Sequence, residues 1–245
     1  MTDFKDRWAL ITGATSGFGR ATANALAARG CHVAITYRTS RREADSTAAA
    51  VRRKGVRAMA VETDQRDGSQ VREAVQAVEA RLGRVDVLIN NASSFYPTPL
   101  ETATDSQWED LIGTNLAGPW YFAQAVSAGM KRRGAGKIVN IVDAAAFSPW
   151  PSYLPYCAAK GGLVTLTWGL AKALAPKIQV NAIAPGPILM PKGVNPAERR
   201  RAIEKTLLKR EGSPQDIVQA VLFLLEGSDF VTGVILPVDG GRLLA

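Results

Sequence analysis

Seven short apolar runs alternate along this chain with longer stretches of helical periodicity, and this alternation constrains the fold more than any other feature. The runs occupy residues 8–12, 33–37, 58–61, 85–89, 138–142, 180–183 and 234–238. The helical patterns occupy residues 19–29, 41–54, 69–82, 105–131, 153–175 and 215–225. Such alternation predicts parallel strands joined by right-handed helical crossovers, and runs that are apolar throughout fit a sheet covered on both faces. The sequence therefore predicts one α/β domain over residues 1–245, with a doubly wound parallel sheet of about seven strands.

A glycine-rich loop, TGATSGFG at residues 12–19, joins the first predicted strand to the first predicted helix. Glycines let the backbone approach a pyrophosphate, and the following helix N-terminus supplies N–H groups and the positive end of a dipole. A tight strand–helix turn without a ligand would look the same in sequence, but this placement is typical of a dinucleotide-binding Rossmann fold. The expected cofactor-binding residues of the loop are Gly13, Ser16, Gly17, Phe18 and Gly19.

The end of the second predicted strand indicates which dinucleotide binds. An acidic residue there would accept hydrogen bonds from the free ribose 2′-hydroxyl of NAD. This chain instead has Tyr37, Arg38 and Thr39, followed by Ser40, and these residues offer donors for a 2′-phosphate. A solvated basic helix start is the alternative, since two further arginines follow. We expect NADP(H), bound in part by Tyr37, Arg38 and Thr39.

Charge and cysteine content exclude several classes of function. The chain has 30 basic and 22 acidic residues, a net charge of +8, but it has no zinc-finger spacing and no long basic arm, so no nucleic-acid partner is expected. Cys31 and Cys157 have no nearby partner in sequence, which favours a reducing cytoplasm. No signal-peptide run follows residues 1–8, and the longest apolar stretches, such as 220–225, are too short for a bilayer. The single histidine, His32, offers little to a metal site.

A series of short motifs follows in order along nearly the whole chain. They are Thr12-Gly13-x-x-x-Gly17-x-Gly19, Asp64 after the third predicted strand, Asn90-Asn91-Ala92 after the fourth, Asn115, Tyr156-x-x-x-Lys160, Pro185-Gly186-Pro187-Ile188 and Val238-Asp239-Gly240-Gly241. Together they resemble the short-chain dehydrogenase/reductase family. The resemblance implies that Asp64 meets the adenine, Asn91 the cofactor and Ile188 the nicotinamide carboxamide, and that the chain forms a homotetramer. Further cofactor contacts are expected at Ala92, Lys160, Pro185 and Gly186.

The Tyr156 and Lys160 pair can be interpreted from its chemistry. Residues four apart share one helix face. A lysine ammonium beside a phenol stabilises the phenolate, which should lower the pKa of the tyrosine and suit it to proton exchange near neutral pH. Tyr-x-x-x-Lys alone is a routine helix pair. With the other motifs, Tyr156, Lys160 and Asn115 are the expected catalytic residues, and Tyr153 is a competing proton donor.

Asp143 stands thirteen positions before Tyr156, where the family usually has a serine that donates a hydrogen bond to a substrate carbonyl. An ionised carboxylate cannot donate, and it would repel the alkoxide formed when a ketone is reduced. It favours a substrate that gains a proton on nitrogen. We therefore count Asp143 with the expected catalytic residues.

The Asp143 pattern is similar to pteridine reductases, a subgroup of the family, and so is the segment NASSFYPTPL at residues 91–100. In that subgroup the phenylalanine stacks on the pterin and the first serine contacts it, which implies substrate-binding roles for Phe95 and Ser93 beside Tyr156. One position departs from the subgroup. Its glycine-rich loop carries an arginine where this chain has Gly17, and Arg20 lies in the following helix.

The sequence predicts an NADPH-dependent oxidoreductase that reduces a pterin or dihydropterin/dihydrofolate-type C=N bond, with protonation by Tyr156. One alternative is a general carbonyl or 3-oxoacyl-thioester reductase of the same fold, against which Asp143 and Phe95 argue. Another is a non-catalytic NADPH-binding regulator, against which the intact catalytic set argues. The Pro/Gly-rich residues 185–196 and the basic helical pattern 197–210 are expected to form a substrate loop or lid at 186–210, rather than an ordinary connection.

Overall fold

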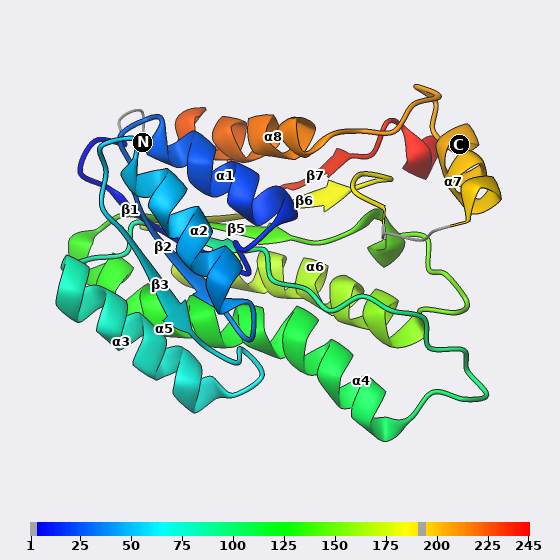
Figure 1. The fold of residues 1–245 in the computed structure, drawn as a ribbon, viewed down its shortest axis with the longest axis horizontal. Coiled ribbons are helices and arrows are strands. Elements are labelled where there is room, and N and C mark those ends of the chain that lie inside the picture. Colours follow the sequence, from blue (N-terminus) through cyan, green and yellow to red (C-terminus); the bar gives the residue numbers. More distant parts are fainter. Residues whose placement is uncertain (1–3, 191–194) are drawn as a thin grey trace.

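The computed structural model describes residues 4–190 and 195–245, and this part of the chain contains a sheet of seven parallel strands (Figure 1). The strands are β1 (Trp8–Thr12), β2 (His32–Tyr37), β3 (Ala58–Glu62), β4 (Val87–Asn90), β5 (Gly136–Ile141), β6 (Ile178–Pro185) and β7 (Ile235–Val238). Their order is β3-β2-β1-β4-β5-β6-β7, and every neighbouring pair is parallel. The predicted single-domain Rossmann fold is confirmed.

Helices cover both faces of the sheet, as Figure 1 shows. One layer contains α1 (Gly17–Ala27), α2 (Arg41–Arg52) and α8 (Pro214–Glu226); the other contains α3 (Gly68–Leu82), α4 (Asp105–Ile112), α5 (Gly118–Arg133) and α6 (Leu154–Leu174). Successive side chains of a strand point to opposite faces. In β1, Ile11 packs into the core under the first layer and Leu10 into the core under the second. Burial on both faces explains why the strand is apolar throughout.

The long helix predicted at 105–131 is interrupted by a π-helical turn, Gly113–Ala117, between α4 and α5. Thr104 begins α4 with a capping box, in which its side chain accepts from Gln107 N. A single wide turn of this kind redirects the side chains it carries and is frequent at functional sites. Here it carries the buried Asn115, whose Nδ2 donates to Leu111 O at 3.0 Å and to Ser94 O at 2.9 Å. The turn thus ties the helix to the segment after β4.

The prediction of a helix at 197–210 is wrong for its second half. The helix α7 (Pro196–Glu204) begins at the capping residue Asn195 and ends at Glu204. The chain then leaves helical geometry because Leu208 N donates to Gly240 O at 3.1 Å, which fastens this segment to the turn after β7. Residues 191–194 of the predicted lid lie outside the described residues.

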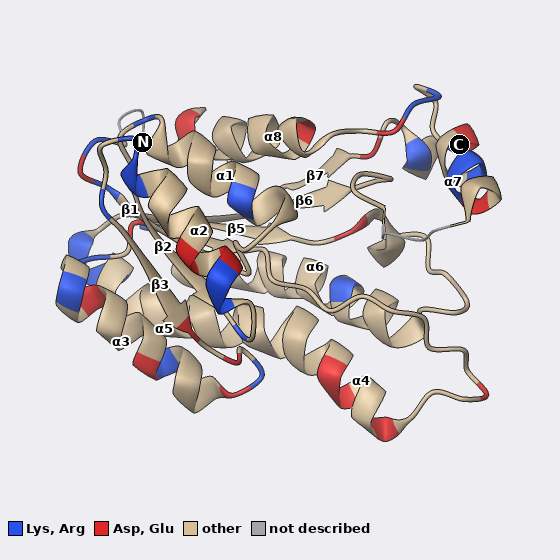
Figure 2. Ribbon diagram, in the orientation of Figure 1, with Lys and Arg blue, Asp and Glu red and all other residues tan. Residues whose placement is uncertain are grey.

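Charge is distributed over the whole molecule. Figure 2 shows Lys and Arg on helices of both layers, with Asp and Glu among them. Within residues 4–190 and 195–245, no helix combines the length and apolar content needed to cross a bilayer.

Candidate active site

A cavity of about 340 Å³ lies at the carboxyl ends of β1, β2 and β4. Parallel strands place their carboxyl ends at one edge of the sheet, which is where ligands bind in open α/β sheets. Among the predicted cofactor-binding residues, those that line the cavity are Gly13, Ser16, Tyr37, Arg38, Thr39, Asp64, Asn91 and Ala92.

Two positions of the glycine-rich loop lie so close to the segment after β4 that a side chain would not fit. Gly13 has φ +63°, and a Cβ there would lie 2.7 Å from Ala92 Cα; a Cβ on Gly19 would lie 2.5 Å from Asn91 Nδ2. The Asn91 amide donates to the carbonyls of Thr12 (2.8 Å) and Gly13 (3.2 Å), fastening the loop to β4. The loop therefore needs glycine at both positions.

The N-terminus of α1 suits an anion. Its first turn contains no acidic residue, and Ser16 makes no side-chain capping bond, so neither competes with a ligand for the helix N–H groups. The ring of Phe18 packs against the core, which leaves only its backbone to a cofactor. Arg20 Nη2 donates to Ser46 Oγ at 3.4 Å, so its side chain points toward α2 and does not replace the loop arginine of pteridine reductases. The site fits a dinucleotide pyrophosphate held by backbone.

A charged network borders the cavity. Arg38 is 47% exposed, and its Nη1 lies 3.5 Å from Asp110 Oδ1. Arg66 donates to Asp64 Oδ1 at 3.0 Å and to Asp110 Oδ1 at 2.9 Å. The hydrogen bond from Arg66 lowers the pKa of Asp64. Tyr96 Oη donates to Asp110 Oδ2 at 3.0 Å, so this aspartate joins the cofactor side of the cavity to segment 91–100. No motif marked Arg66 in the sequence; its position two residues after Asp64 was the only available signal.

Tyr156 and Asp143 are in direct contact. Tyr156 Oη donates to Asp143 Oδ2 at 2.8 Å, while Asp143 Oδ1 accepts from Ala145 N at 2.7 Å. The second bond begins the 3₁₀ turn Ala144–Ala146 and holds the carboxyl group after β5. Burial raises the pKa of Asp143, although its hydrogen bonds oppose the shift. The carboxyl group therefore holds its proton more strongly than an exposed aspartate does.

Lys160 does not bring the pKa of Tyr156 below its usual value, as the sequence predicted. The pKa of Tyr156 lies well above its usual value of 10, first because of burial and then because of Asp143. Burial also lowers the pKa of Lys160 to about 8. The Lys160 ammonium lies 5.6 Å from the Tyr156 ring centroid and donates to Ile141 O at 2.8 Å. The predicted lowering of the tyrosine pKa is wrong here because desolvation and the nearby carboxylate outweigh the ammonium.

Ser93 and Asn115 lie beside this pair. Ser93 Oγ donates to Asn115 Oδ1 at 2.6 Å. A hydrogen bond with Ser93 also acts on Tyr156, where it lowers the phenol pKa against the stronger effects of burial and Asp143. The structure thus brings Ser93, Asn115, Asp143, Tyr156 and Lys160 into one site.

Aromatic rings form one wall of the site. Phe95 stacks on Tyr153, with ring centroids 4.7 Å apart and planes 7° apart, and meets Tyr156 edge-on at 4.9 Å. Trp150 meets Phe95 at 6.1 Å and Tyr153 at 5.8 Å, both nearly perpendicular. Phe95 remains 37% exposed, but Tyr153 already covers one of its faces. Tyr153 precedes α6 as its N-cap instead of lying within the helix, and Trp150 carried no signal in the sequence.

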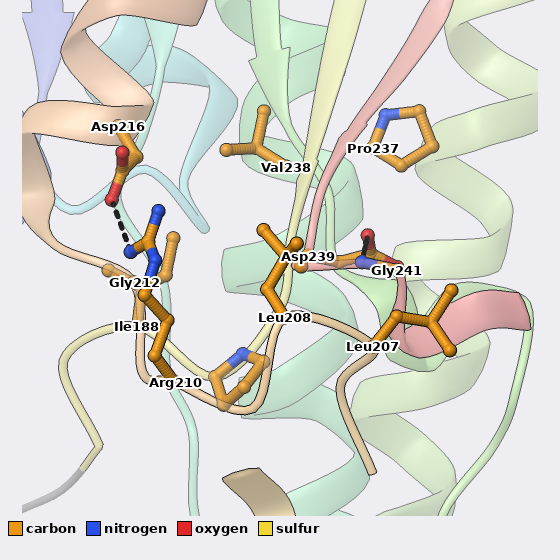
Figure 3. A pocket seen from close by; sticks show the side chains of 12 residues that line it. Ile188, Leu207, Leu208, Arg210, Gly212, Asp216, Pro237, Val238, Asp239 and Gly241 are labelled. Carbon is orange, nitrogen blue, oxygen red and sulfur yellow. Dashed lines mark hydrogen bonds and ion pairs between the residues drawn. The ribbon is translucent and has the colours of Figure 1, made fainter. Parts of the chain in front are cut away.

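The loop after β6 approaches the turn after β7. A Cβ on Gly186, next to Pro185, would lie 2.5 Å from Asp239 Cα. Ile188 N donates to Gly186 O at 2.8 Å. The Ile188 side chain faces a second cavity, of about 370 Å³, shown in Figure 3 with Leu207, Leu208 and Gly241 around it. Neither Tyr156 nor Asp143 lines this cavity, so it is separate from the proton-transfer groups.

Comparison with known proteins agrees with this geometry. Residues 13–242 match the family model described as enoyl-(acyl carrier protein) reductase. The 3-oxoacyl-(acyl-carrier-protein) reductase FabG of Staphylococcus epidermidis is 35% identical over 240 residues, covering 96% of this chain and 98% of that protein.

Several solved structures are similar to this chain over nearly their whole lengths. A Sinorhizobium meliloti protein assigned to the short-chain alcohol dehydrogenases has a TM-score of 0.93 at 35% identity, covering 100% of this chain and 99% of that one. A blue fluorescent protein from a metagenomic library, solved with NADPH, has a TM-score of 0.89 at 35% identity, covering 98% of this chain and 99% of that one.

This chain belongs to the short-chain dehydrogenase/reductase family of oxidoreductases. The comparisons support the family and not the pteridine reductase subgroup, because the relative named above is a 3-oxoacyl reductase.

Proposed function

We propose that this chain is an NADPH-dependent reductase that transfers a hydride to the C=N bond of a flat, pterin-like heterocycle, with Tyr156 as the proton donor. The observation that carries the proposal is the 2.8 Å hydrogen bond from Tyr156 to Asp143. An ionised carboxylate only accepts, so beside the proton donor it favours a substrate or product that presents N–H groups. Phe95, half-exposed at the aromatic wall, offers such a ring an edge or face to pack against.

NADP(H) is the cofactor that best fits the first cavity. The glycine cradle and the uncapped start of α1 suit a pyrophosphate, and Arg38 at the rim suits a ribose 2′-phosphate. The NADPH complex of the metagenomic protein supports this choice. Bound NADPH supplies the hydride. We expect the backbone after β6, from Pro185 to Ile188, and the ammonium of Lys160 to hold its nicotinamide half; none of these residues lines the first cavity itself.

With its pKa above the usual value of 10, Tyr156 is protonated at neutral pH and carries the proton that an acid must give. When hydride reaches the carbon of the C=N bond, the nitrogen gains an electron pair, and Tyr156 gives it the proton. Lys160, with a pKa of about 8, is still mostly charged at neutral pH and stabilises the phenolate that remains. Asp143 accepts from the hydroxyl before this transfer and from a substrate N–H during it. Asn115 and Ser93 lie beside this pair and are joined to each other by their 2.6 Å bond.

A second candidate is reduction of a carbonyl, such as that of a 3-oxoacyl thioester. The name of the Staphylococcus epidermidis relative favours this function over pterin reduction. The site permits it in one protonation state. Burial raises the pKa of Asp143, and a protonated carboxyl group can donate to a carbonyl oxygen as the family serine does.

Steady-state NADPH oxidation with biopterin, dihydrobiopterin, dihydrofolate, 3-oxoacyl thioesters and simple activated ketones separates the candidates. We expect the highest kcat/KM with a pterin or dihydropterin. A preference for the thioesters or ketones would replace the first proposal with the second. Tight NADPH binding with no turnover in any class would instead indicate a regulatory role.

We also propose that the chain assembles as a homotetramer. Two helical layers each expose large apolar side chains: Trp120 on α5 and Trp168 on α6 are 42% and 46% exposed, and Phe223 on α8 is 57% exposed. Two separate apolar faces can form the two isologous interfaces of a tetramer with two-fold symmetry. Light scattering should give four times the mass of the chain. Trp168→Glu and Phe223→Glu should each yield dimers, and a wild-type monomer would overturn the proposal.

A further inference from the structure

The turn after β7 brings a cation to the edge of the candidate active site. Arg242 lies in the short helix Arg242–Leu244, and its guanidinium carbon is 5.8 Å from the centroid of the Trp150 ring. Trp150 in turn packs edge-on against Phe95. Arg242 is also close enough to Asp143 for its charge to lower the pKa of that carboxyl group, against the effect of burial. A residue near the end of the chain therefore faces groups contributed by the segments after β4 and β5.

The position of Arg242 is built into the backbone. Gly240 and Gly241 have φ of +65° and +80°, which other residues rarely adopt, and a Cβ on Gly241 would lie 2.8 Å from Leu207 Cδ1. Asp239 accepts from Gly241 N and from Leu243 N, both at 2.9 Å, and so holds the turn on either side of Arg242. Arg242 Nη1 donates to Ala202 O in α7 at 3.2 Å. The arginine is thus anchored at its backbone and at one nitrogen of its side chain.

The charge of Arg242 is not neutralised by the protein around it. Throughout residues 4–190 and 195–245, no Asp or Glu carboxylate forms an ion pair with it. Its side chain donates to one carbonyl and covers one aromatic face, lies near enough to Asp143 for their charges to interact, and is half-buried. A guanidinium has five N–H donors in a planar fork that matches a carboxylate, and such paired bonds strengthen when water is partly excluded. Most of this donor capacity is left for a ligand.

We propose that Arg242 is a specificity-determining residue that binds a carboxylate of the substrate beyond the Phe95–Trp150 edge. The site then recognises two features of one molecule. Asp143 accepts from an N–H near the reacting bond, and Arg242 donates to an anionic group farther out. The substrate class is a small planar or acyl compound that carries a carboxylate. This inference rests on the proposed function for the identity of the reacting bond, but the carboxylate contact can be measured without turnover.

The test uses full-length protein saturated with NADP⁺ and two matched ligand pairs. One pair is pterin-6-carboxylate and 6-methylpterin; the other is acetoacetate and methyl acetoacetate. Dissociation constants are measured by calorimetry for wild type, Arg242→Gln, Arg242→Lys and Arg52→Gln. Arg52→Gln is the matched control because it removes the same charge from an exposed arginine whose side chain also donates to one carbonyl, Ala58 O at 3.1 Å, at the start of β3 and away from the site.

We expect the carboxylate member of at least one pair to bind tighter than its neutral partner. Arg242→Gln should reduce this preference about ten- to a hundred-fold, the range for a charge-assisted hydrogen bond. Arg242→Lys should restore only part of it, because an ammonium lacks the planar fork. Arg52→Gln should leave it unchanged. If Arg242 only anchored α7 through Ala202, Arg242→Gln would weaken charged and neutral ligands equally.

The inference is overturned if wild type shows no carboxylate preference or binds none of the four ligands. It is also overturned if Arg242→Gln keeps the preference, or if Arg52→Gln reduces it as much. Failure of the proposed function has a different signature. If the pterins bind with an Arg242-dependent preference while NADPH reduces only the oxo compounds, the carboxylate contact stands and the C=N assignment falls.

Discussion

The hydroxyl of Tyr156, at the start of α6, donates a 2.8 Å hydrogen bond to Oδ2 of Asp143, two residues after β5. In the resting site the proton donor therefore faces a carboxylate where the family usually places a serine. Burial, and after it this contact, raises the pKa of the tyrosine, and the hydrogen bond fixes the direction of its hydroxyl. Most of the chemistry expected of the chain can be tested through these two residues and their neighbours.

Asp143 should select the substrate class. Asp143→Ser restores a hydroxyl that can donate to a carbonyl, so it should lower kcat/KM for pterins and raise it for activated ketones. Asp143→Asn keeps the shape and loses the charge, so it should impair pterin reduction without improving ketone reduction. Because one charge-assisted hydrogen bond is lost, kcat/KM should change by about ten- to a hundred-fold. Unchanged preference in Asp143→Ser, or a wild type that already prefers ketones, would remove Asp143 as the selector.

Tyr156→Phe should abolish proton donation. We expect kcat to fall by about 10²–10⁴-fold, the usual contribution of general acid catalysis, while NADPH binding measured by fluorescence stays within a few-fold of wild type. Tyr153→Phe is the matched control. It keeps the stacking on Phe95 and loses only a hydroxyl, so kcat should remain near normal. The opposite ranking of the two variants would make Tyr153 the proton donor.

Arg38 should distinguish NADPH from NADH. Arg38→Ala removes the guanidinium at the cavity rim and should weaken NADPH binding about ten- to a hundred-fold, with little effect on NADH. Arg41→Ala, which removes an exposed arginine that lies 3.8 Å from Asp45, is the control. Equal use of both cofactors by the wild type would contradict the prediction, and an equal loss in Arg41→Ala would indicate only a general effect of charge.

The pH dependence of turnover should report Lys160. Burial lowers the lysine pKa to about 8, so its positive charge is present below that value and is lost as the pH rises through it. Stabilisation of the Tyr156 phenolate disappears with the charge, and kcat should therefore fall above about pH 8. Measurement of kcat from about pH 6 to about pH 10 checks this, because an unperturbed lysine would titrate only near 10.4. Lys160→Met should be slow and should lack this falling limb.

Asp143 should cost stability at neutral pH. Its pKa in the folded chain is raised above the ordinary value of 3.8, so between these two values the folded state holds a proton that the unfolded state has released. Stability therefore falls as the pH rises through that window. Asp143→Asn should raise Tm at neutral pH by about 2–4 °C, the shift expected for roughly 1 kcal/mol in a chain of this size. This increase in Tm should become smaller toward pH 4. An increase that does not depend on pH would show that the ionisation of Asp143 is not its cause.

Local patterns in the sequence were sufficient for the architecture and for much of the cofactor site. Apolar runs covered on both faces identified the strands, and the glycines of loop 12–19 identified the dinucleotide end. Both follow from short-range rules, since strand burial and close backbone approach leave their mark on neighbouring residues. The spacing of Tyr156 and Lys160 likewise placed both residues on one helix face before any tertiary contact was known.

Tertiary structure decided the electrostatics and the walls of the site. The pKa of Tyr156 is raised rather than lowered, because burial and Asp143 outweigh Lys160. Neither the burial of the phenol nor its contact with Asp143 follows from the spacing of residues along a helix. Tyr153 covers a face of Phe95 from a segment distant in sequence. Arg242 reaches Trp150 only because the turn after β7 folds back beside α7. Desolvation and contacts between distant segments are properties of the assembled fold, so the sequence alone could not determine them.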